Sequence, residues 1–182
     1  QILFLSDCLK IIKRGYLTND TFVDELEKRM ALYFDHKKAI STNSGTSALQ
    51  IMFSSFCKEN DHIIMPNNTF IATWQAACIC KLNIHLVDTN ESGVGICPEH
   101  LRYTLSRLHD ASIQPKAIVD VHIGGFISKY WGKCKNIAEE FNCVYLEDSA
   151  QAFGSQTNCG LKAGSLGEAG VHSFHLTKVL TG

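Results

Sequence analysis

The 182-residue chain lacks a long hydrophobic run, an excess of charge of either sign and any CxxC pair of cysteines. No apolar segment approaches the roughly 18 residues that a membrane-spanning helix needs, and the first residues lack the basic and apolar regions of a signal peptide. We therefore expect no membrane partner and a cytoplasmic location. Lys and Arg total 17 against 18 Asp and Glu, so the net charge is -1. A chain this close to neutral has no strong field to attract nucleic acid, and we expect small-molecule partners.

The eight cysteines do not form a disulfide framework in this interpretation, because 45% of the residues are hydrophobic and can build a core without one. We expect reduced thiols. Cys78 and Cys80 diverge on a predicted helix, so they should pack in the core and not chelate a metal. His172 and His175 have an odd separation, which sends their rings to opposite faces of a strand. The sequence predicts no metal site.

Short apolar runs alternate with amphipathic segments along the whole chain, which is the pattern of βαβ units. This predicts an α/β fold in three layers, with a mostly parallel sheet between helices. The predicted helices cover residues 20–34, 48–56, 70–82, 98–108 and 128–141, and the predicted strands cover 39–42, 62–65, 84–87, 117–121, 144–147 and 171–174.

Turns follow several of these strands, and in an open parallel sheet the ligand lies beyond the carboxyl ends of the strands. The turns at Ser44, Asn67, His122, Asp148 and Lys178 should therefore converge on one edge. This edge is where we expect the functional residues.

Residues 43–47 join a predicted strand directly to a helix start. Free backbone N–H groups and the helix dipole at such a point favour an anion such as phosphate, and Gly45 lets the backbone approach it closely. For this motif alone, an ordinary N-cap by Ser44 or Thr46 is the simpler interpretation.

Asp148, Phe70 and Lys178 each allow two interpretations. Asp148 could hold a protonated ring nitrogen or serve as a cap or loop-stabilising residue, while Glu147 should point to the other side of the strand. Phe70 could pack in the core with Trp74 or cover a flat ring at the ligand edge. An isolated lysine is usually a surface charge. Lys178, however, lies in an apolar segment with few other charges, where burial would lower the pKa of its amine and make it a Schiff-base nucleophile.

Five motifs in matching order and spacing resemble the DegT/DnrJ/EryC1/StrS family of pyridoxal-phosphate-dependent sugar aminotransferases. They are NSGTSAL (43–49), PNNTFIAT (66–73), VDVHIGG (119–125), YLEDSAQAFGS (145–155) and HSFHLTKVLTG (172–182). The stretch from Gly15 to Asp20 also looks like the family's N-terminal region, so the resemblance covers nearly the whole chain.

The resemblance implies a role for each residue of the site. Gly45 and Thr46 would bind the phosphate of pyridoxal 5'-phosphate, and Ser173 would add its hydroxyl. Phe70 would stack on the pyridine ring, Asp148 would pair with the ring nitrogen, and Gln151 would lie near the ring oxygen. Lys178 would be the catalytic residue, which forms the internal aldimine and moves the proton.

The implied activity is transfer of an amino group from an amino acid, glutamate or glutamine, to a nucleotide-linked keto sugar. Relatives that dehydrate their sugar replace the lysine with histidine, so Lys178 favours transamination. The alternatives are another pyridoxal-phosphate enzyme of this fold, such as a dehydratase or a cyclitol or aminobenzoate enzyme, and a non-catalytic relative.

The family fold is a large domain around a mostly parallel seven-stranded sheet, followed by a smaller C-terminal domain, in a homodimer with active sites at the subunit interface. The chain opens at Gln1 and stops soon after Lys178. We therefore expect residues 1–182 to be the N-terminal part of the cofactor-binding large domain, without the small domain and inactive alone.

Overall fold

The computed structural model describes residues 2–15 and 21–181, and it divides into two compact units, residues 1–41 and 42–182. The first unit contains helix α1 (Ile2–Arg14) and helix α2 (Thr21–Phe34). Helix α2 confirms the helix predicted over 20–34, although Asp20, with the rest of 16–20, lies outside the described residues. No helix in the described ranges has both the length and the apolar character to cross a membrane.

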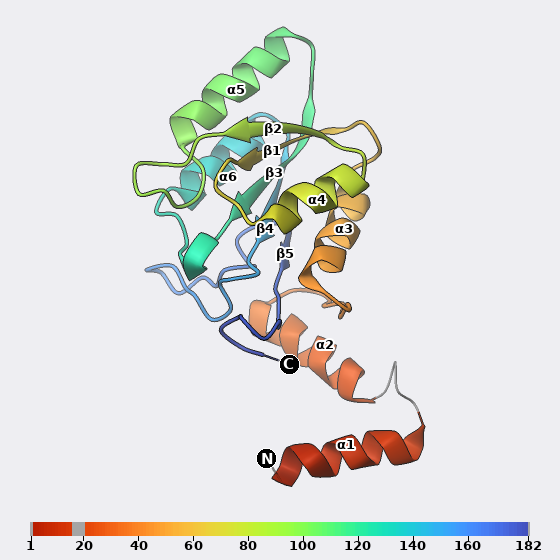
Figure 1. The fold of residues 1–182 in the computed structure, drawn as a ribbon. Helices are drawn as coiled ribbons and strands as arrows, with labels where there is room; N and C mark the ends of the chain where they lie inside the picture. Colours follow the sequence, from red (N-terminus) through yellow and green to blue (C-terminus); the bar gives the residue numbers. More distant parts are fainter. Residues whose placement is uncertain (1, 16–20, 182) are drawn as a thin grey trace. The chain divides into compact units, whose positions relative to one another are not determined.

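The second unit is a five-stranded sheet with helices on both sides (Figure 1). The strand order is β2-β1-β3-β4-β5, and every pairing is parallel, which confirms the predicted α/β class. In chain order the elements are α3 (Gly45–Phe56), β1 (His62–Pro66), α4 (Ile71–Ile79), β2 (Asn83–Val87), α5 (Pro98–Asp110), β3 (Pro115–Val121), the 3-10 turn η1 (Ile123–Gly125), α6 (Trp131–Glu140), β4 (Val144–Asp148) and β5 (Ala169–Val171).

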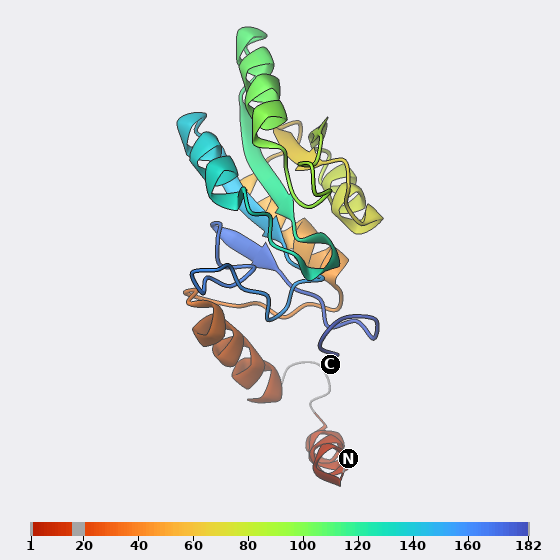
Figure 2. The ribbon, with the colours of Figure 1, turned by 90° about the vertical axis from the view of Figure 1, so that its left-hand side faces the viewer.

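Helices α3 and α4 cover one face of the sheet, and α5 and α6 cover the other (Figure 2). The two faces bury separate apolar clusters. Ile63 of β1 packs with Phe53 of α3, whereas its neighbour Ile64 packs with Leu101 of α5. Because successive side chains of a strand point to opposite faces, a central strand covered on both sides is apolar at every position. This explains why the sequence shows short continuous apolar runs.

Helices α4, α5 and α6 end in the same way, each followed by a residue with a left-handed backbone that is not glycine. These residues are Lys81 (φ 55°), Ser112 (φ 59°) and Asn142 (φ 53°). After α4, the Leu82 N–H reaches back to the Ala77 carbonyl at 3.1 Å, which closes the last turn. The chain therefore leaves the helix before residue 82, where the sequence had predicted its end.

The strand predicted over 39–42 is wrong. Both the backbone N–H and the hydroxyl of Ser41 donate to the Glu27 carboxylate, at 2.7 and 2.8 Å, so this N–H is not available for a sheet. Ile40 is exposed, whereas a strand side chain in this position would need a covered face.

The positions of strand β5 and of the start of helix α6 also differ from the prediction. Strand β5 covers Ala169–Val171 and not 171–174, because its partner β4 ends at Asp148, which is paired with Val171. Helix α6 begins at Trp131 and not at Ser128, because the Ser128 hydroxyl accepts the Tyr130 N–H in a turn that precedes the helix.

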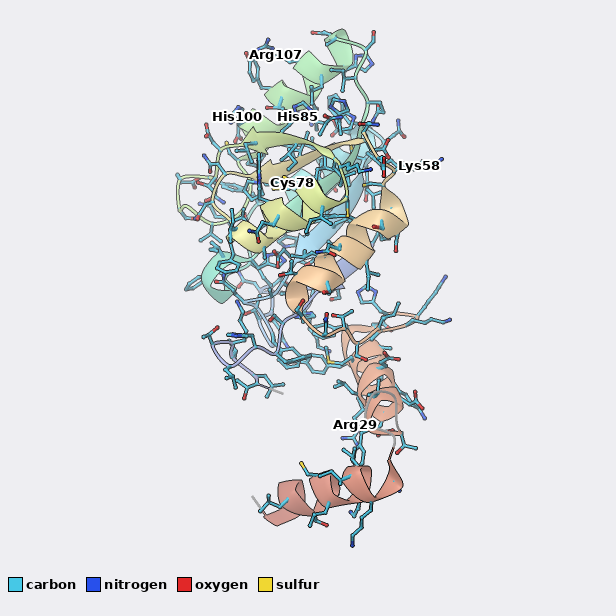
Figure 3. The ribbon with its side chains drawn as sticks, turned by 45° about the vertical axis from the view of Figure 1, so that its right-hand side comes forward. Arg29, Lys58, Cys78, His85, His100 and Arg107 are labelled. Atoms are coloured by element: carbon cyan, nitrogen blue, oxygen red, sulfur yellow. The ribbon has the colours of Figure 1, made fainter. Side chains whose placement is uncertain are left out.

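Cys78 corrects the expectation of core packing, since its side chain on α4 is exposed (Figure 3). Cys80, the residue at the end of that helix, is half-buried against the core. Helix α4 is shorter than the predicted helix, and Cys78 lies on the side of α4 that faces away from the core.

Candidate active site

A pocket of about 460 Å³ lies in the second unit, where the loops after the strands meet. Its size is typical of small-molecule sites. The lining residues are Gly45, Thr46, Leu49, Phe70, Ala72, Val121, His122, Asp148, Ala150, Gln151, Ser173, His175, Thr177 and Lys178. Each of the seven residues singled out from the sequence is in this set. Asn67 is not part of the lining, and its side-chain amide instead donates to Asp88 at 3.2 Å.

Helix α3 presents its N-terminus to the pocket. Ser44 is the N-cap, and its Oγ accepts the Ser47 N–H at 3.1 Å, which confirms the ordinary capping interpretation for Ser44. The N–H groups of Gly45 and Thr46 belong to the first turn, which has no acceptors within the helix. A Cβ atom on Gly45 would lie 3.2 Å from Cβ of Ser173, so glycine lets Ser173 come close to the helix start.

Asp148 is a buried carboxyl group at the end of β4. Its Oδ2 accepts the Thr73 hydroxyl at 2.6 Å, and its Oδ1 accepts the Ala150 N–H at 3.1 Å. Burial raises the pKa of Asp148, and the two hydrogen bonds and the nearby charges of His122 and Lys178 oppose this rise without cancelling it. Whether Asp148 is ionised therefore depends on the hydrogen bonds and charges around it.

Thr73 is a site residue that the sequence reasoning missed. It is fully buried on α4, one turn after Phe70, and its hydroxyl also lies 2.7 Å from the hydroxyl of Thr69. The sequence separates Thr73 from Asp148 by 75 positions, so only the position of Thr73 relative to Phe70 on the predicted helix could have indicated this contact.

Phe70 and Lys178 lie next to each other in the lining of the pocket. Phe70 is the N-cap residue of α4 and is 57% exposed, and Trp74 is 37% exposed, so the core alternative for these two rings is wrong. The Lys178 Nζ lies 5.6 Å from the centroid of the Phe70 ring, within the range of a cation–π interaction. The Lys178 N–H donates to the His175 carbonyl at 2.8 Å, which fixes the turn that carries the amine.

Gln151 is oriented by the turn after β3. Its Oε1 accepts the Gly124 N–H at 2.8 Å, which leaves the NH2 end of the side chain to act as the donor. Gly124 has φ 64°, a conformation that favours glycine, so the turn that places this N–H depends on it.

A second buried pair, His122 and Glu147, was also missed as a site feature. His122 Nε2 lies 2.8 Å from Glu147 Oε2, and both side chains are 0% exposed. Burial alone would raise the pKa of Glu147, but His122 and the N–H groups of Gly164 and Gly167 hold it below its usual value. As expected from the pleat, Glu147 and Asp148 contact different partners.

No cluster of three or more His, Cys, Asp or Glu side chains in the described part of the chain could hold a metal ion. The pocket instead combines a helix N-terminus, a buried carboxyl group, an exposed aromatic ring and an amine. This set of groups suits an organic ligand with an anionic end and a flat ring.

The chain is also similar to known proteins of one enzyme family. A model of the DegT/DnrJ/EryC1/StrS aminotransferase family matches residues 3–182. The UDP-4-amino-4,6-dideoxy-N-acetyl-beta-L-altrosamine transaminase of Campylobacter jejuni is 31% identical over 172 residues, or 94% of this chain and 44% of that protein. The GDP-perosamine synthase of Caulobacter vibrioides is 33% identical over 163 residues, or 88% of this chain and 41% of that protein.

A crystal structure of a DegT DnrJ EryC1 StrS aminotransferase from Brucella abortus superposes with a TM-score of 0.85 at 25% identity, covering 93% of this chain and 45% of that one. The chain thus spans less than half the length of these relatives.

Proposed function

Because the chain belongs to the DegT/DnrJ/EryC1/StrS aminotransferase family, we propose that it is the cofactor-binding part of a pyridoxal-phosphate-dependent sugar aminotransferase. The reaction is transfer of an amino group from an amino acid, glutamate or glutamine, to a nucleotide-linked keto sugar. The relatives named as a UDP-sugar transaminase and a GDP-perosamine synthase support the substrate class.

One observation carries this proposal: seven residues from separate segments of the chain line a single pocket. They are Gly45, Thr46, Phe70, Asp148, Gln151, Ser173 and Lys178. Their chemistry fits pyridoxal phosphate at both ends, since a helix start suits the phosphate and a buried carboxylate suits a protonated ring nitrogen.

At the phosphate end, Gly45 and Thr46 would bind through their N–H groups and Ser173 through its hydroxyl. The absence of a side chain at residue 45 supports this role, because a Cβ there would come within 3.2 Å of Ser173. The dipole of the twelve-residue helix α3 adds to the attraction for the phosphate.

At the ring end, Asp148 would hold a proton on the ring nitrogen while Thr73 keeps the carboxylate in place at 2.6 Å. Phe70 would cover one face of the ring and exclude water, and the NH2 group of Gln151 would donate to the ring oxygen. When bound, the cofactor supplies an electron-withdrawing ring that takes up negative charge from the reacting carbon of the substrate.

Lys178 would hold the cofactor through its Nζ and afterwards move a proton to and from the substrate carbon. Its amine lies above the Phe70 ring, and both residues line the pocket. The presence of lysine at this position supports amino transfer over dehydration.

The remaining parts of the proposal concern the whole protein. Residues 1–182 would form the N-terminal part of the large domain, with a smaller C-terminal domain beyond them, in a cytoplasmic homodimer. Exposed apolar side chains on α3 and α4, including Ile51, Ile71 and Ile79, support a covering partner on that side.

The test uses the full-length protein incubated with pyridoxal 5'-phosphate, reduced with borohydride and digested for mass spectrometry. We expect a pyridoxyl group on Lys178 and its loss in Lys178→Ala. Lys133→Ala, on the exposed side of α6, is the matched control and should be labelled at Lys178 like the wild type. Label scattered over surface lysines, or no bound cofactor, would reject the proposed function.

A further inference from the structure

Glu147 is a buried carboxylate whose acceptor positions are filled by the chain itself. Its Oε1 accepts the N–H groups of Leu166 and Gly167 at 2.6 and 2.7 Å, and its Oε2 accepts that of Gly164 at 2.7 Å. A carboxylate with three such donors is held as an anion, which can only accept. The imidazole of His122, 2.8 Å from Oε2, must therefore donate through Nε2.

With Nε2 protonated, the charge of His122 depends on whether Nδ1 also carries a proton. The charged groups that face the ring are the carboxylates of Asp120 on β3 and of Glu147 and Asp148 on β4. Burial disfavours a charged imidazole, but the hydrogen bond to Glu147 and the three carboxylates outweigh it and raise the pKa of His122. His122 thus lies in the pocket wall with its orientation set by Glu147, and the groups around it favour the charged form of its ring.

His122 Nδ1 is buried, and no described residue forms a hydrogen bond with it. A buried donor without an acceptor costs about 1–3 kcal/mol, so a structural role alone would favour an apolar ring here. A cost of this kind is typical of a group retained for the chemistry of a site.

A positive charge on His122 favours the ionised form of Asp148. Its hydrogen bonds to Thr73 and Ala150 and the charges of His122 and Lys178 favour the ionised form, while burial works against all of them. A neutral Asp148 could not balance a protonated ring nitrogen. In the proposed reaction the Lys178 amine changes its bonding, whereas His122 stays beside Asp148.

We propose that His122 is a positioning residue of the site: Glu147 fixes its Nε2–H, and its charge keeps Asp148 ionised to receive the ring nitrogen of the cofactor. This inference rests on the proposed function, because it requires a ligand whose ring nitrogen meets Asp148. His122 acts through Asp148 and does not itself take part in the reaction.

The test measures the dissociation constant of pyridoxal 5'-phosphate from the full-length protein by equilibrium dialysis, from about pH 5 to pH 8, the range in which histidine side chains ordinarily change charge. His122→Gln keeps an N–H for Glu147 and removes the charge. We expect roughly tenfold weaker binding at neutral pH. The pH below which binding is lost should move upward, because Asp148 becomes easier to protonate. His100→Gln, on α5 outside the pocket, is the control and should match the wild type (Figure 3).

An analogue of the cofactor with carbon in place of the ring nitrogen separates positioning from structure. His122→Gln should bind this analogue as well as the wild type does, because Asp148 then has no partner to lose. Equal loss of both ligands, or no change with either ligand, would overturn the inference and leave the proposed function intact. A wild type that binds no cofactor would reject both.

Should His122→Gln fail to fold, nitrogen NMR of the wild-type imidazole gives an independent answer. Two protonated ring nitrogens on His122 at neutral pH support the inference, and a neutral ring contradicts it.

Discussion

Thr73→Val removes one hydroxyl from the site and leaves the shape of the side chain almost unchanged. In the wild type this hydroxyl donates to Asp148 Oδ2 at 2.6 Å, and both side chains are buried. A hydrogen bond to a charged group contributes about 1.5–3 kcal/mol, and the Ala150 N–H to Oδ1 remains in the variant. We therefore expect the lower end of this range, which corresponds to roughly tenfold weaker binding of pyridoxal phosphate at neutral pH.

The pH dependence of this effect follows from the direction of the Asp148 shift. Its pKa is raised above the ordinary value of 3.8 in the folded protein, so burial of the ionised form costs stability as the pH rises through the folded pKa. Thr73→Val should raise this pKa further. The variant should be less stable than the wild type at neutral pH, and the difference should shrink below about pH 3.8, where the carboxyl group is protonated in both states and the hydroxyl donates to a neutral group.

The assay is denaturant unfolding of the cofactor-free protein at neutral and acidic pH, together with dialysis of the cofactor at neutral pH. Thr104→Val, the same change on α5 away from the pocket, is the control and should alter neither result. If Thr73→Val loses the same stability at both pH values, the hydroxyl does not act through the charge of Asp148 and the reasoning is wrong.

Three further predictions concern the scaffold, and each is checked by denaturant unfolding. Gly170→Ala should destabilise the protein by about 1–3 kcal/mol, because the added Cβ would lie 2.5 Å from Cα of Gly164. Gly132→Ala is the control: it lies in a helix with no atom within 4 Å of the added Cβ, and it should be neutral or slightly stabilising. Ser112→Gly should stabilise by about 1 kcal/mol, since it relieves the left-handed backbone after α5; a loss of stability would count against strain at this residue. Glu147 has a lowered pKa, so its contribution is present above its ordinary value of 4.5 and is lost as the pH falls through the folded pKa. Glu147→Gln should therefore lower the free energy of unfolding at neutral pH, and this free energy should depend less on pH in the acid range than in the wild type. An unchanged dependence of stability on pH would contradict this.

The sequence predicted the sheet well because apolar runs such as 62–65 and 117–121 are buried on both faces, and a short continuous run of this kind is typical of a strand between two helical layers. It also singled out half of the residues that line the pocket, because the carboxyl ends of parallel strands share one edge. The strand at 39–42 failed for a local reason: the Glu27 side chain captures the Ser41 backbone. No periodicity reveals a competition of that kind.

The residues that were missed act through contacts between segments distant in the sequence. Thr73 and Asp148 are 75 positions apart, and His122 and Glu147 are 25 apart. Both Thr73 and His122 lie inside motifs that the sequence analysis had already selected, yet nothing in either motif identifies its partner. The end of α4 was misplaced because the residue after its last turn, Lys81, takes the left-handed conformation without the glycine that usually marks such an end.

Glu147 and Asp148 are neighbours at the end of β4, and the pleat gives them different partners. Asp148 serves the pocket, while Glu147 binds His122 and the loop that leads to β5. A slip of one residue in this strand would exchange the positions of the two carboxylates, and both would lose their partners. Insertions or deletions of a single residue within β4 should therefore be far more damaging than most substitutions, and any engineering of this protein should change the length of its surface loops and keep the length of this strand.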